Sequence, residues 1–364
     1  MIPIFQPYLK GNEDKYINRC VKTNWISSQG SFVKKFENQF SKYHNMKYCL
    51  TTSSCTTAIH LSLLTFGISK GDEIICPSLT FIAPANMIKM TGATPVFVDV
   101  DCDTLTIDYK KIENKITNKT KAIMVVHQFG HAAHMNEINQ IAKRYNLKII
   151  EDCAESLGAN YKSKKTGTIG DVSCFSFFSN KIITTGEGGA ILTNNKAFYN
   201  NAKIIRDHGM SLKKKYLFVK LGTNYRMTNL QAAIGLAQLE KIHKILNIRK
   251  KQMTLYYNKL KDVKQISLRA FDTYTKPVHW LMTIKLLNSS RSKFIKHMKK
   301  KGIECRPMID PVITAYHFRK YQINNEFSKT KKITKSYLHL PSSTNLKENE
   351  ILYICKEIKK YFKN

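Results

Sequence analysis

The stretch CFSFFSNKIITTGEGGAILT (residues 174–193) decides how the chain folds, because it joins two strand-like runs through a glycine-rich turn. Lys181 stands between those runs. Its neighbours in sequence are apolar: Phe177, Phe178, Ile182 and Ile183. A lysine among such side chains loses hydration, which favours the neutral amine that attacks a carbonyl carbon and forms a Schiff base. The alternative is a surface lysine whose stem covers apolar area while its ammonium reaches water.

On both sides of the turn, short apolar runs alternate with helical stretches. The expected strands are residues 48–50, 73–76, 94–98, 122–127, 148–151, 172–176 and 189–192. Strands that alternate with helices pair in parallel and are covered by helices on both faces. The pattern therefore predicts an α/β fold with a mostly parallel, seven-stranded sheet.

The remaining sequence predicts a second, smaller unit. Residues 229–260 carry apolar residues at helical spacing and predict one long helix that leaves the sheet. After it, residues 278–286 are typical of a strand, and residues 291–301 and 349–362 are typical of helices. A chain of 364 residues suits a large domain and a small one. We expect a large α/β domain over 1–235 and a small α+β domain over 236–364.

Composition narrows the class of protein. The net charge of +33 raises the hypothesis of a nucleic-acid-binding scaffold, but the lysines are scattered, which favours a solvated basic surface that attracts anionic small molecules. Nine cysteines form no CxxC pair, which favours reduced thiols over disulfides or a metal site. No apolar run of about 18 residues and no signal peptide are present, which predicts a cytoplasmic protein without a membrane anchor.

The segment SSCTTAIH (residues 53–60) follows the first strand and opens a helix with small, hydroxylated residues. Free backbone N–H groups and the positive end of a helix bind phosphate in such a place. A plain Ser or Thr helix cap fits the segment equally well. Further along, Ser176 offers a hydroxyl to the same phosphate, and the glycines of residues 186–189 let the backbone turn closely past Lys181.

Two further residues suit a flat heteroaromatic ligand. Phe81, in PSLTFIAPAN (residues 77–86), follows a strand and can cover a ring, although a core position is its alternative. Asp152 ends the buried run LKIIED (residues 147–152), at the sheet edge where ligands of such folds bind. A carboxylate there keeps a pyridine nitrogen protonated, whereas a helix-capping role is the alternative. Together with Lys181 these features predict a pyridoxal phosphate (PLP) site.

The order of the motifs resembles one known family. The strings SCTTA, PSLTFIAPAN, VHQFG, EDCAE, FSFFSNKIITTGEGG, GTNYRMTNLQAA and LPSS are similar to the DegT/DnrJ/EryC1/StrS family of sugar aminotransferases, from Ile4 to the C-terminus. Within it, SNKIITTGEGG and NYRMTN most resemble enzymes that aminate C4 of nucleotide-linked sugars. The resemblance implies fold type I of PLP-dependent transferases, the aspartate aminotransferase architecture.

The resemblance also implies the role of each site residue. Lys181 forms the Schiff base with PLP, Asp152 pairs with the pyridine nitrogen and Phe81 stacks on the ring. The phosphate is held by four residues: Ser176, the backbone of Cys55 and Thr56, and Asn224 from the partner subunit of a homodimer. Glu155 stands near the ring, where many relatives carry glutamine. Cys55 stands where relatives commonly have glycine, and a backbone contact there requires a negative φ.

The implied reaction is a ping-pong transamination. L-glutamate gives its amino group to the cofactor and leaves as 2-oxoglutarate, and a nucleoside-diphosphate-linked 4-keto-6-deoxy sugar then receives that group at C4. A 3-keto or N-acetylated 4-keto sugar is an alternative acceptor, and an inactive nucleic-acid-binding scaffold is the alternative from another class. A sugar dehydratase of the same family is disfavoured, because those proteins carry histidine where this chain has Lys181.

Candidate contacts to the sugar nucleotide lie in several loops: Trp25, Ser27, Tyr225, Arg226, His279 and Arg306. Two histidines are also candidates for an acid or base: His127, at the end of an apolar run, and His208, in RDHG (residues 206–209). A histidine at the end of a buried strand is more often a satisfied structural residue than an acid or base, and we interpret both in that way.

Overall fold

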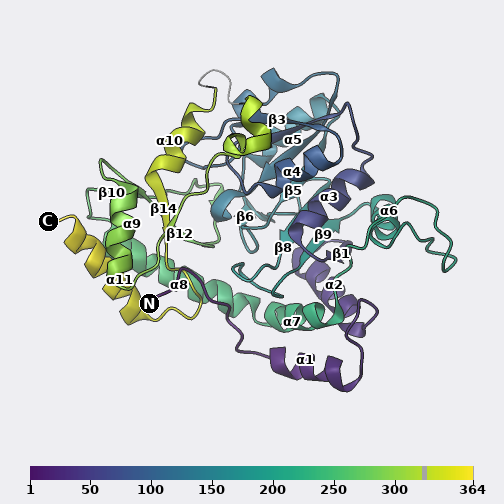
Figure 1. Cartoon of the computed structure of the whole chain (residues 1–364), viewed down its shortest axis with the longest axis horizontal. Coiled ribbons are helices and arrows are strands. Elements are labelled where there is room, and N and C mark those ends of the chain that lie inside the picture. Colours follow the sequence, from purple (N-terminus) through teal and green to yellow (C-terminus); the bar gives the residue numbers. More distant parts are fainter. Residues whose placement is uncertain (322–325, 364) are drawn as a thin grey trace.

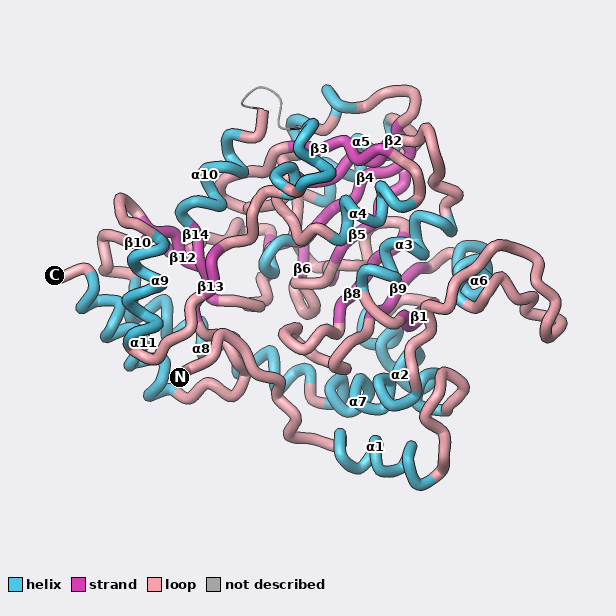
Figure 2. The backbone as a smooth tube through the Cα atoms, viewed as in Figure 1, coloured by secondary structure: helices cyan, strands magenta, loops and turns pink. Residues whose placement is uncertain are grey.

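The structure is a computed structural model and describes residues 1–321 and 326–363. Its centre is a seven-stranded sheet (Figure 2). The strands are β1 Tyr48–Thr52, β2 Glu73–Pro77, β3 Thr94–Val98, β4 Thr120–Val126, β5 Lys148–Asp152, β8 Val172–Ser176 and β9 Gly189–Thr193. They lie in the order β1-β9-β8-β5-β4-β2-β3, and only β9 runs antiparallel to its neighbours. The predicted mostly parallel, seven-stranded sheet is confirmed.

Helices cover both faces of this sheet (Figure 1). One face packs against α2 Ser31–His44, α5 Met135–Arg144 and α7 Asn229–Glu240, with α1 Glu13–Lys22 outside α7. The other face packs against α3 Cys55–Thr65, α4 Ala83–Met90 and α6 Lys196–Arg206. Side chains alternate between the two faces, so that Met124 and Ile150 join the core beneath α3, while Ile123 and Ile149 join the core beneath α5. This double burial explains the continuous apolar runs.

A four-stranded antiparallel sheet forms the core of the C-terminal part. It consists of β10 Ile266–Leu268, β12 Met282–Leu286, β14 Tyr337–Leu340 and β13 Arg306–Pro307, in that order. Its helices are α8 Ile242–Leu260, α9 Arg291–Lys300 and α11 Glu348–Tyr361, while α10 Ser328–Ser336 leads into β14. A small third sheet contains β6 Asn160–Tyr161, β7 Lys164–Lys165 and β11 Thr275–Lys276. The expected strand over 278–286 is confined to β12.

The predicted long helix over 229–260 is two helices, α7 and α8, which meet at Lys241. Lys241 has φ −107° and ψ 13°, outside the helical region. Its ammonium binds the carboxylate of Glu13 on α1, and Gln238 donates to the same carboxylate. A contact between residues so far apart in sequence redirects the helix and leaves no trace in the local periodicity.

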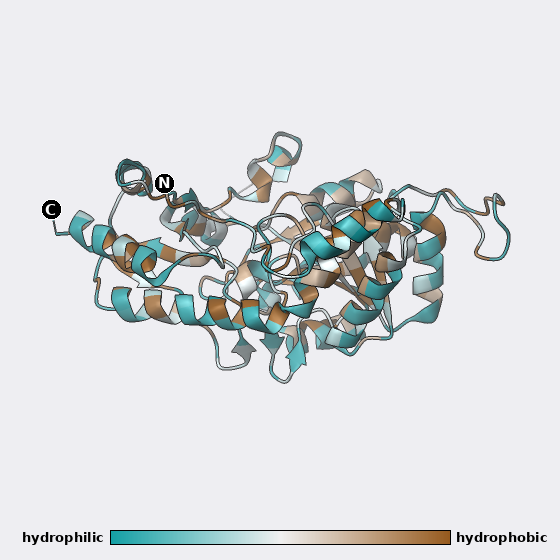
Figure 3. Cartoon of the chain, turned by 90° about the horizontal axis from the view of Figure 1, so that it is seen from below, coloured by the Kyte–Doolittle hydropathy of each residue, from teal (hydrophilic) through white to brown (hydrophobic). Residues whose placement is uncertain are grey.

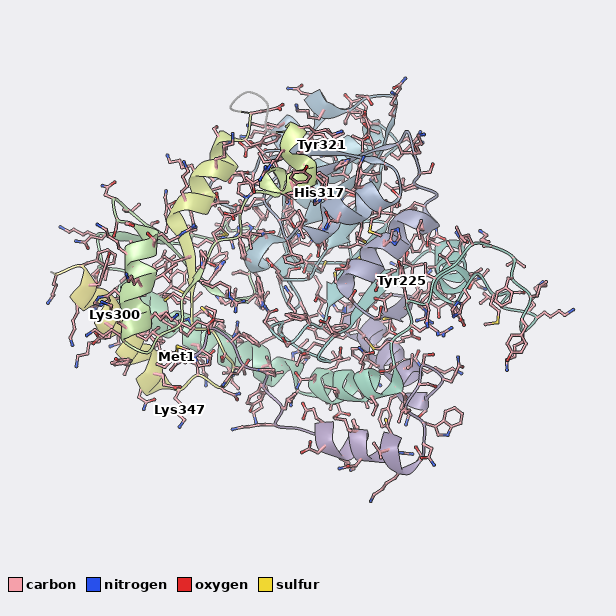
Figure 4. All side chains as sticks on the ribbon, viewed as in Figure 1. Met1, Tyr225, Lys300, His317, Tyr321 and Lys347 are labelled. Carbon is pink, nitrogen blue, oxygen red and sulfur yellow. The ribbon has the colours of Figure 1, made fainter. Side chains whose placement is uncertain are left out.

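The first residues of the chain lie near α8 and α11, beside the four-stranded sheet (Figure 1 and Figure 4). The amide of Ile2 donates to the carbonyl of Gly302 at 2.6 Å, and that of Ile4 donates to the carboxylate of Glu304 at 2.8 Å. The N-terminal strap formed by residues 1–4 therefore ties the start of the chain to its C-terminal part. The domain boundary at 235/236 stays a prediction.

Hydrophobic and hydrophilic residues alternate along the helices, as expected for helices that each bury one side (Figure 3). Within residues 1–321 and 326–363, no helix combines the length and apolar character that a membrane crossing requires. All nine cysteines are free thiols, and eight of them are buried.

We expect the stability of the fold to decrease as the pH falls from about 6.5 to 5. Burial lowers the pKa of His44 and His339 to about 3 and that of His131 and His279 to about 4. The unfolded chain, with histidine pKa values near 6.5, takes up protons in this window that the folded chain does not. Each fully buried histidine then costs about 1.4 kcal/mol of unfolding free energy per pH unit.

Urea unfolding at several pH values measures this slope. The exposed His208 supplies the control, because His208→Asn leaves every buried histidine in place, so the slope should stay the same. Equal unfolding free energies at pH 7 and pH 5 would contradict the expectation.

Candidate active site

A cavity of about 500 Å³ opens where β4, β5 and β8 end. The last residues of these strands, Val126, Asp152 and Ser176, all line it. Eight residues that the sequence predicted for the site line the same cavity: Cys55, Thr56, Phe81, Asp152, Glu155, Ser176, Lys181 and Arg306. The carboxyl edge of a parallel sheet is the place where ligands of such folds bind.

Lys181 reaches into this cavity from the turn after β8, and its side chain is 13% exposed. Its Nζ lies 3.7 Å from Oε1 of Glu155 and 3.9 Å from the ring centroid of Trp280. Of the phenylalanines beside it in sequence, Phe177 belongs to the core, whereas Phe178 is half exposed and lines the same cavity. The contacts of the amine thus come from distant segments of the chain.

Asp152 carries a buried carboxylate, 5% exposed, with an Ala154 N–H donating to it at 2.9 Å. Burial raises the pKa of Asp152, which the Ala154 N–H and the Lys181 ammonium partly offset. Within the described residues it forms no ion pair, so a cationic group placed beside it in the cavity would stabilise its charged form. A protonated pyridine nitrogen is such a group, and this carboxylate therefore fits PLP.

The start of α3 forms a phosphate-sized cradle at one end of the cavity. Ser54 and Thr57 form a capping box that fixes this first turn, where the N–H groups of Cys55 and Thr56 have no preceding turn to bond with. Cys55 is not among the residues with positive φ, so a side chain is tolerated there, and burial raises the pKa of its thiol. Ser176 lines the cavity as well. The set suits the phosphate of PLP.

Gly189 keeps this cradle in place, because an added Cβ would lie 2.5 Å from the Ser54 carbonyl carbon and 2.6 Å from the Cys55 nitrogen. We expect Gly189→Ala to weaken PLP binding about tenfold or more and to lower the unfolding free energy by about 1–3 kcal/mol. Equilibrium dialysis and urea unfolding measure the two effects.

The control for this change is Gly67→Asn, since Gly67 is exposed, has a φ of 78° that asparagine tolerates, and has nothing within 4 Å of an added Cβ. A Gly189→Ala protein that binds PLP as tightly as Gly67→Asn would show that this close approach does not shape the cradle.

Phe81 and Glu155 complete the cavity wall around a flat ligand. Phe81 is 62% exposed at the end of β2, so it is not the core residue that its sequence context also allowed. Glu155 accepts a hydrogen bond from the Phe129 N–H at 2.9 Å, and burial raises the pKa of its carboxyl. The uncovered ring of Phe81 and the buried carboxyl of Glu155 thus form two walls of the cavity, which can take a planar ligand between them.

Most candidate substrate contacts lie outside the cavity of their own chain. Of the six, only Arg306 lines it, 3.6 Å from Glu304. Trp25 is 56% exposed between α1 and α2, where the carbonyl of Ser27 accepts the amide of Asn229.

Tyr225, another candidate, lies beside α3 (Figure 4), where its hydroxyl and the ring of His60 are hydrogen-bonded at 2.9 Å. Arg226, the next residue, forms an ion pair with Asp207 after α6. The adjacent Asn224 pairs with the backbone of Asp207 and is not among the residues that line the cavity in the described chain. None of these three residues therefore lines the site of its own chain.

His279 stacks edge-on against Phe271 and does not line the cavity, whereas the next residue, Trp280, does. The loop between β11 and β12 has no regular period, so the sequence offered no basis for choosing between the two. Sequence reasoning also missed Gln128, in the turn after β4, and His339, on β14, which both line the cavity. His127, between β4 and Gln128, is buried and does not line the cavity.

Both ring nitrogens of His127 are used within the protein. Nδ1 accepts the amide of Ala133 at 3.1 Å, so Nε2 carries the hydrogen and donates to Glu151 at 2.8 Å. Glu151 also accepts amides of the turn before β8, from Gly167 and Ile169. His127 therefore joins β4 to β5 and is a structural residue, and the exposed His208 is not among the residues that line the cavity.

Comparison with known proteins agrees with this geometry. The family model of the DegT/DnrJ/EryC1/StrS aminotransferases matches residues 7–359. GDP-perosamine synthase of Escherichia coli O157:H7 is 42% identical over 363 residues, which are 99% of this chain and 98% of that protein. The subgroup that the motif strings resemble is thus found among the relatives, and a basic nucleic-acid-binding scaffold is not favoured.

Solved structures show the same architecture. The Helicobacter pylori aminotransferase PseC, involved in the biosynthesis of pseudoaminic acid, superposes with a TM-score of 0.94 at 26% identity, covering 100% of this chain and 99% of that one. A Streptococcus pneumoniae protein solved in its PMP form has a TM-score of 0.93 at 26% identity, covering 99% of this chain and 98% of that one. The chain belongs to the DegT/DnrJ/EryC1/StrS family and is a PLP-dependent aminotransferase.

Proposed function

We propose that the protein transfers the amino group of L-glutamate to C4 of a nucleoside-diphosphate-linked 4-keto-6-deoxy sugar. The observation that carries the chemistry is the meeting of Lys181 with the buried carboxyls of Asp152 and Glu155 in one cavity. The observation that selects the substrate class is the 42% identity to GDP-perosamine synthase over nearly the whole chain.

The cavity residues divide the binding of the cofactor among them. When bound, PLP supplies an electron sink for the substrate carbon that bears the nitrogen. Asp152 keeps the ring nitrogen protonated, because a nearby positive charge stabilises its buried carboxylate. Phe81 covers one face of the ring. The first turn of α3 and Ser176 bind the phosphate.

Lys181 moves the proton in both halves of the reaction. It attaches the cofactor through its amine and, once released, takes a proton from the carbon of the amino donor and delivers it at the cofactor carbon next to the ring. With the sugar bound, it performs the reverse transfer. Glu155 lies 3.7 Å from Nζ and keeps the amine over the cavity during these transfers.

The acceptor is tested with a panel of sugar nucleotides. The enzyme is first converted with glutamate to the pyridoxamine phosphate form and freed of 2-oxoglutarate. It is then mixed with GDP-linked or dTDP-linked sugars that carry a 3-keto group, a 4-keto group, or a 4-keto group together with an N-acetylamino group. We expect rapid return of the PLP absorbance only with the 4-keto-6-deoxy sugars. A faster return with the 3-keto or N-acetylated sugar would contradict this assignment.

We also propose a homodimer in which Asn224 of each chain binds the phosphate in the partner's site. In support, Asn224 is absent from the described lining of its own cavity. The nearby loop that projects beyond α6 (Figure 2) exposes apolar side chains that a second copy would cover: Leu212, Tyr216, Leu217, Phe218, Val219 and Leu221. We propose further that the protein is cytoplasmic, as expected from the sequence.

Mixing two inactive variants tests the shared site. A heterodimer of Lys181→Ala with Asn224→Ala contains one site with both residues intact, so activity should reappear after the two proteins are unfolded and refolded together. Mixtures that stay inactive while each variant alone forms dimers would show that the sites are not shared.

A further inference from the structure

Trp280 lies against the reactive amine of the site. It stands between β11 and β12, is 6% exposed and lines the cavity. The Nζ atom of Lys181 lies 3.9 Å from the centroid of its ring. An ammonium over an indole face is attracted by the negative charge of the ring face, and indole is the strongest of the aromatic side chains in this respect.

Three contacts fix the orientation of this ring. Its N–H donates to the carbonyl of Asn180, the residue before Lys181, at 2.6 Å. Its plane lies within 2° of that of Phe129, with ring centroids 6.1 Å apart. The main-chain carbonyl of Trp280 accepts a hydrogen bond from the guanidinium of Arg249, on α8. The same guanidinium also donates to the carbonyl of His279 at 2.8 Å. The indole is therefore held from its edge, its face and its main chain.

Arg249 shows how strongly this loop is held. It is 1% exposed, and burial lowers its pKa to about 9, yet its hydrogen bonds within the described chain all go to the carbonyls of His279 and Trp280. A buried guanidinium without a carboxylate is unfavourable unless its donors are used. Nε and Nη2 of Arg249 donate to this loop, whereas Nη1 has no hydrogen-bond partner within the described residues. Its presence beneath the loop indicates that the position of Trp280 matters to the site.

A ring and a carboxylate hold the amine in different ways. Glu155 attracts the ammonium but can also take its proton, whereas the indole face attracts the cation and cannot accept a proton from it. We propose that Trp280 is a positioning residue for the capture of the cofactor, whose indole face holds the Lys181 ammonium in place over the cavity until the amine bonds to PLP. The inference rests on the role proposed for Lys181.

Other charged or titratable groups also border the cavity, and they stay constant in the test below: Cys55, Asp152, Glu155, Glu187, Arg306 and His339. The readout is the capture of PLP by the cofactor-free protein. Capture joins the Lys181 nitrogen to the aldehyde carbon, and the aldehyde oxygen leaves as water with two hydrogens of the amine. The rate rises with pH, because the ammonium must first lose a proton to become a nucleophile.

The composition of the chain allows a clean substitution, since it has only two tryptophans. In a Trp25→Phe background, growth on tryptophan, monofluorotryptophan or difluorotryptophan changes the indole at position 280 alone. Fluorine withdraws charge from the ring face and hardly alters its size. We expect the midpoint of the capture rate against pH to move stepwise to lower values, by up to about one pH unit over the series.

Pyridoxamine phosphate separates positioning from the shape of the cavity, since it cannot be captured covalently. Its affinity should be equal throughout the series and in Trp280→Phe. The phenyl ring of Trp280→Phe has a weaker face than indole, so its midpoint should lie between those of the tryptophan and difluorotryptophan proteins. Tyr43→Leu is the matched control, because it removes the ring that lies 3.7 Å from Nζ of Lys165, outside the cavity. It should leave the midpoint unchanged.

A midpoint that stays constant across the fluorinated series would overturn the inference. So would a shift of equal size in Tyr43→Leu. If the Trp25→Phe protein with ordinary tryptophan at position 280 binds pyridoxamine phosphate but never captures PLP, this would instead contradict the role of Lys181 on which the inference rests.

Discussion

Replacing Lys181 with alanine should lower kcat by about 10⁴-fold while leaving pyridoxamine phosphate bound. The amine is the group in the cavity that both attaches the cofactor and moves the proton, and loss of a positioned acid or base costs about 10²–10⁴-fold in rate. Phosphate and ring contacts come from α3, Phe81 and Ser176, so noncovalent binding should persist. Single-turnover kinetics with glutamate and dialysis against pyridoxamine phosphate measure the two quantities.

Two variants complete this test. Lys181→Arg keeps a positive charge but supplies no nucleophile, so it should be as inactive as the alanine variant. Lys164→Ala removes an exposed lysine on β7 and should be fully active. A Lys181→Ala protein that retains more than about a tenth of its activity would assign the proton transfer to another group.

Replacing Asp152 with alanine should lower the rate of the glutamate half-reaction by about 10³-fold, as expected when a charge that stabilises a developing charge is removed. The ring nitrogen then loses its counter-ion and its proton, and the electron sink weakens. The buried position of Asp152, 5% exposed, makes the effect large because water cannot replace the carboxylate.

Cofactor methylated at the ring nitrogen provides the control for Asp152. That methyl group fixes the positive charge without a carboxylate, and Asp152→Ala vacates the space that it needs. The methylated cofactor should therefore restore much of the activity of Asp152→Ala and none of that of Lys181→Ala. Restoration of neither variant would indicate that Asp152 acts by shaping the cavity.

The central sheet was predictable because its strands are buried on both faces. Such strands read as apolar runs, and all seven expected runs lie within one or two residues of the observed strands. The ends of three of them, at Val126, Asp152 and Ser176, line the cavity, so the sheet alone positions Asp152 and Ser176 in the site.

The parts that escaped prediction depend on contacts between distant residues. The break at Lys241 follows from its ion pair with Glu13, and the choice of Trp280 over His279 follows from the hydrogen bond of the Trp280 indole N–H to the Asn180 carbonyl. Neither contact affects the local periodicity from which helices and strands are read. Phe81 was open to two interpretations, because only the three-dimensional structure shows its ring uncovered.

The most direct test of the account follows the nitrogen atom itself. The purified enzyme is incubated with ¹⁵N-labelled L-glutamate and a GDP-linked 4-keto-6-deoxy sugar, and the product is examined by NMR. We predict that the label appears on C4 of the sugar at the same rate as 2-oxoglutarate forms. Label on another carbon, or 2-oxoglutarate formation without any labelled sugar, would contradict the proposed function.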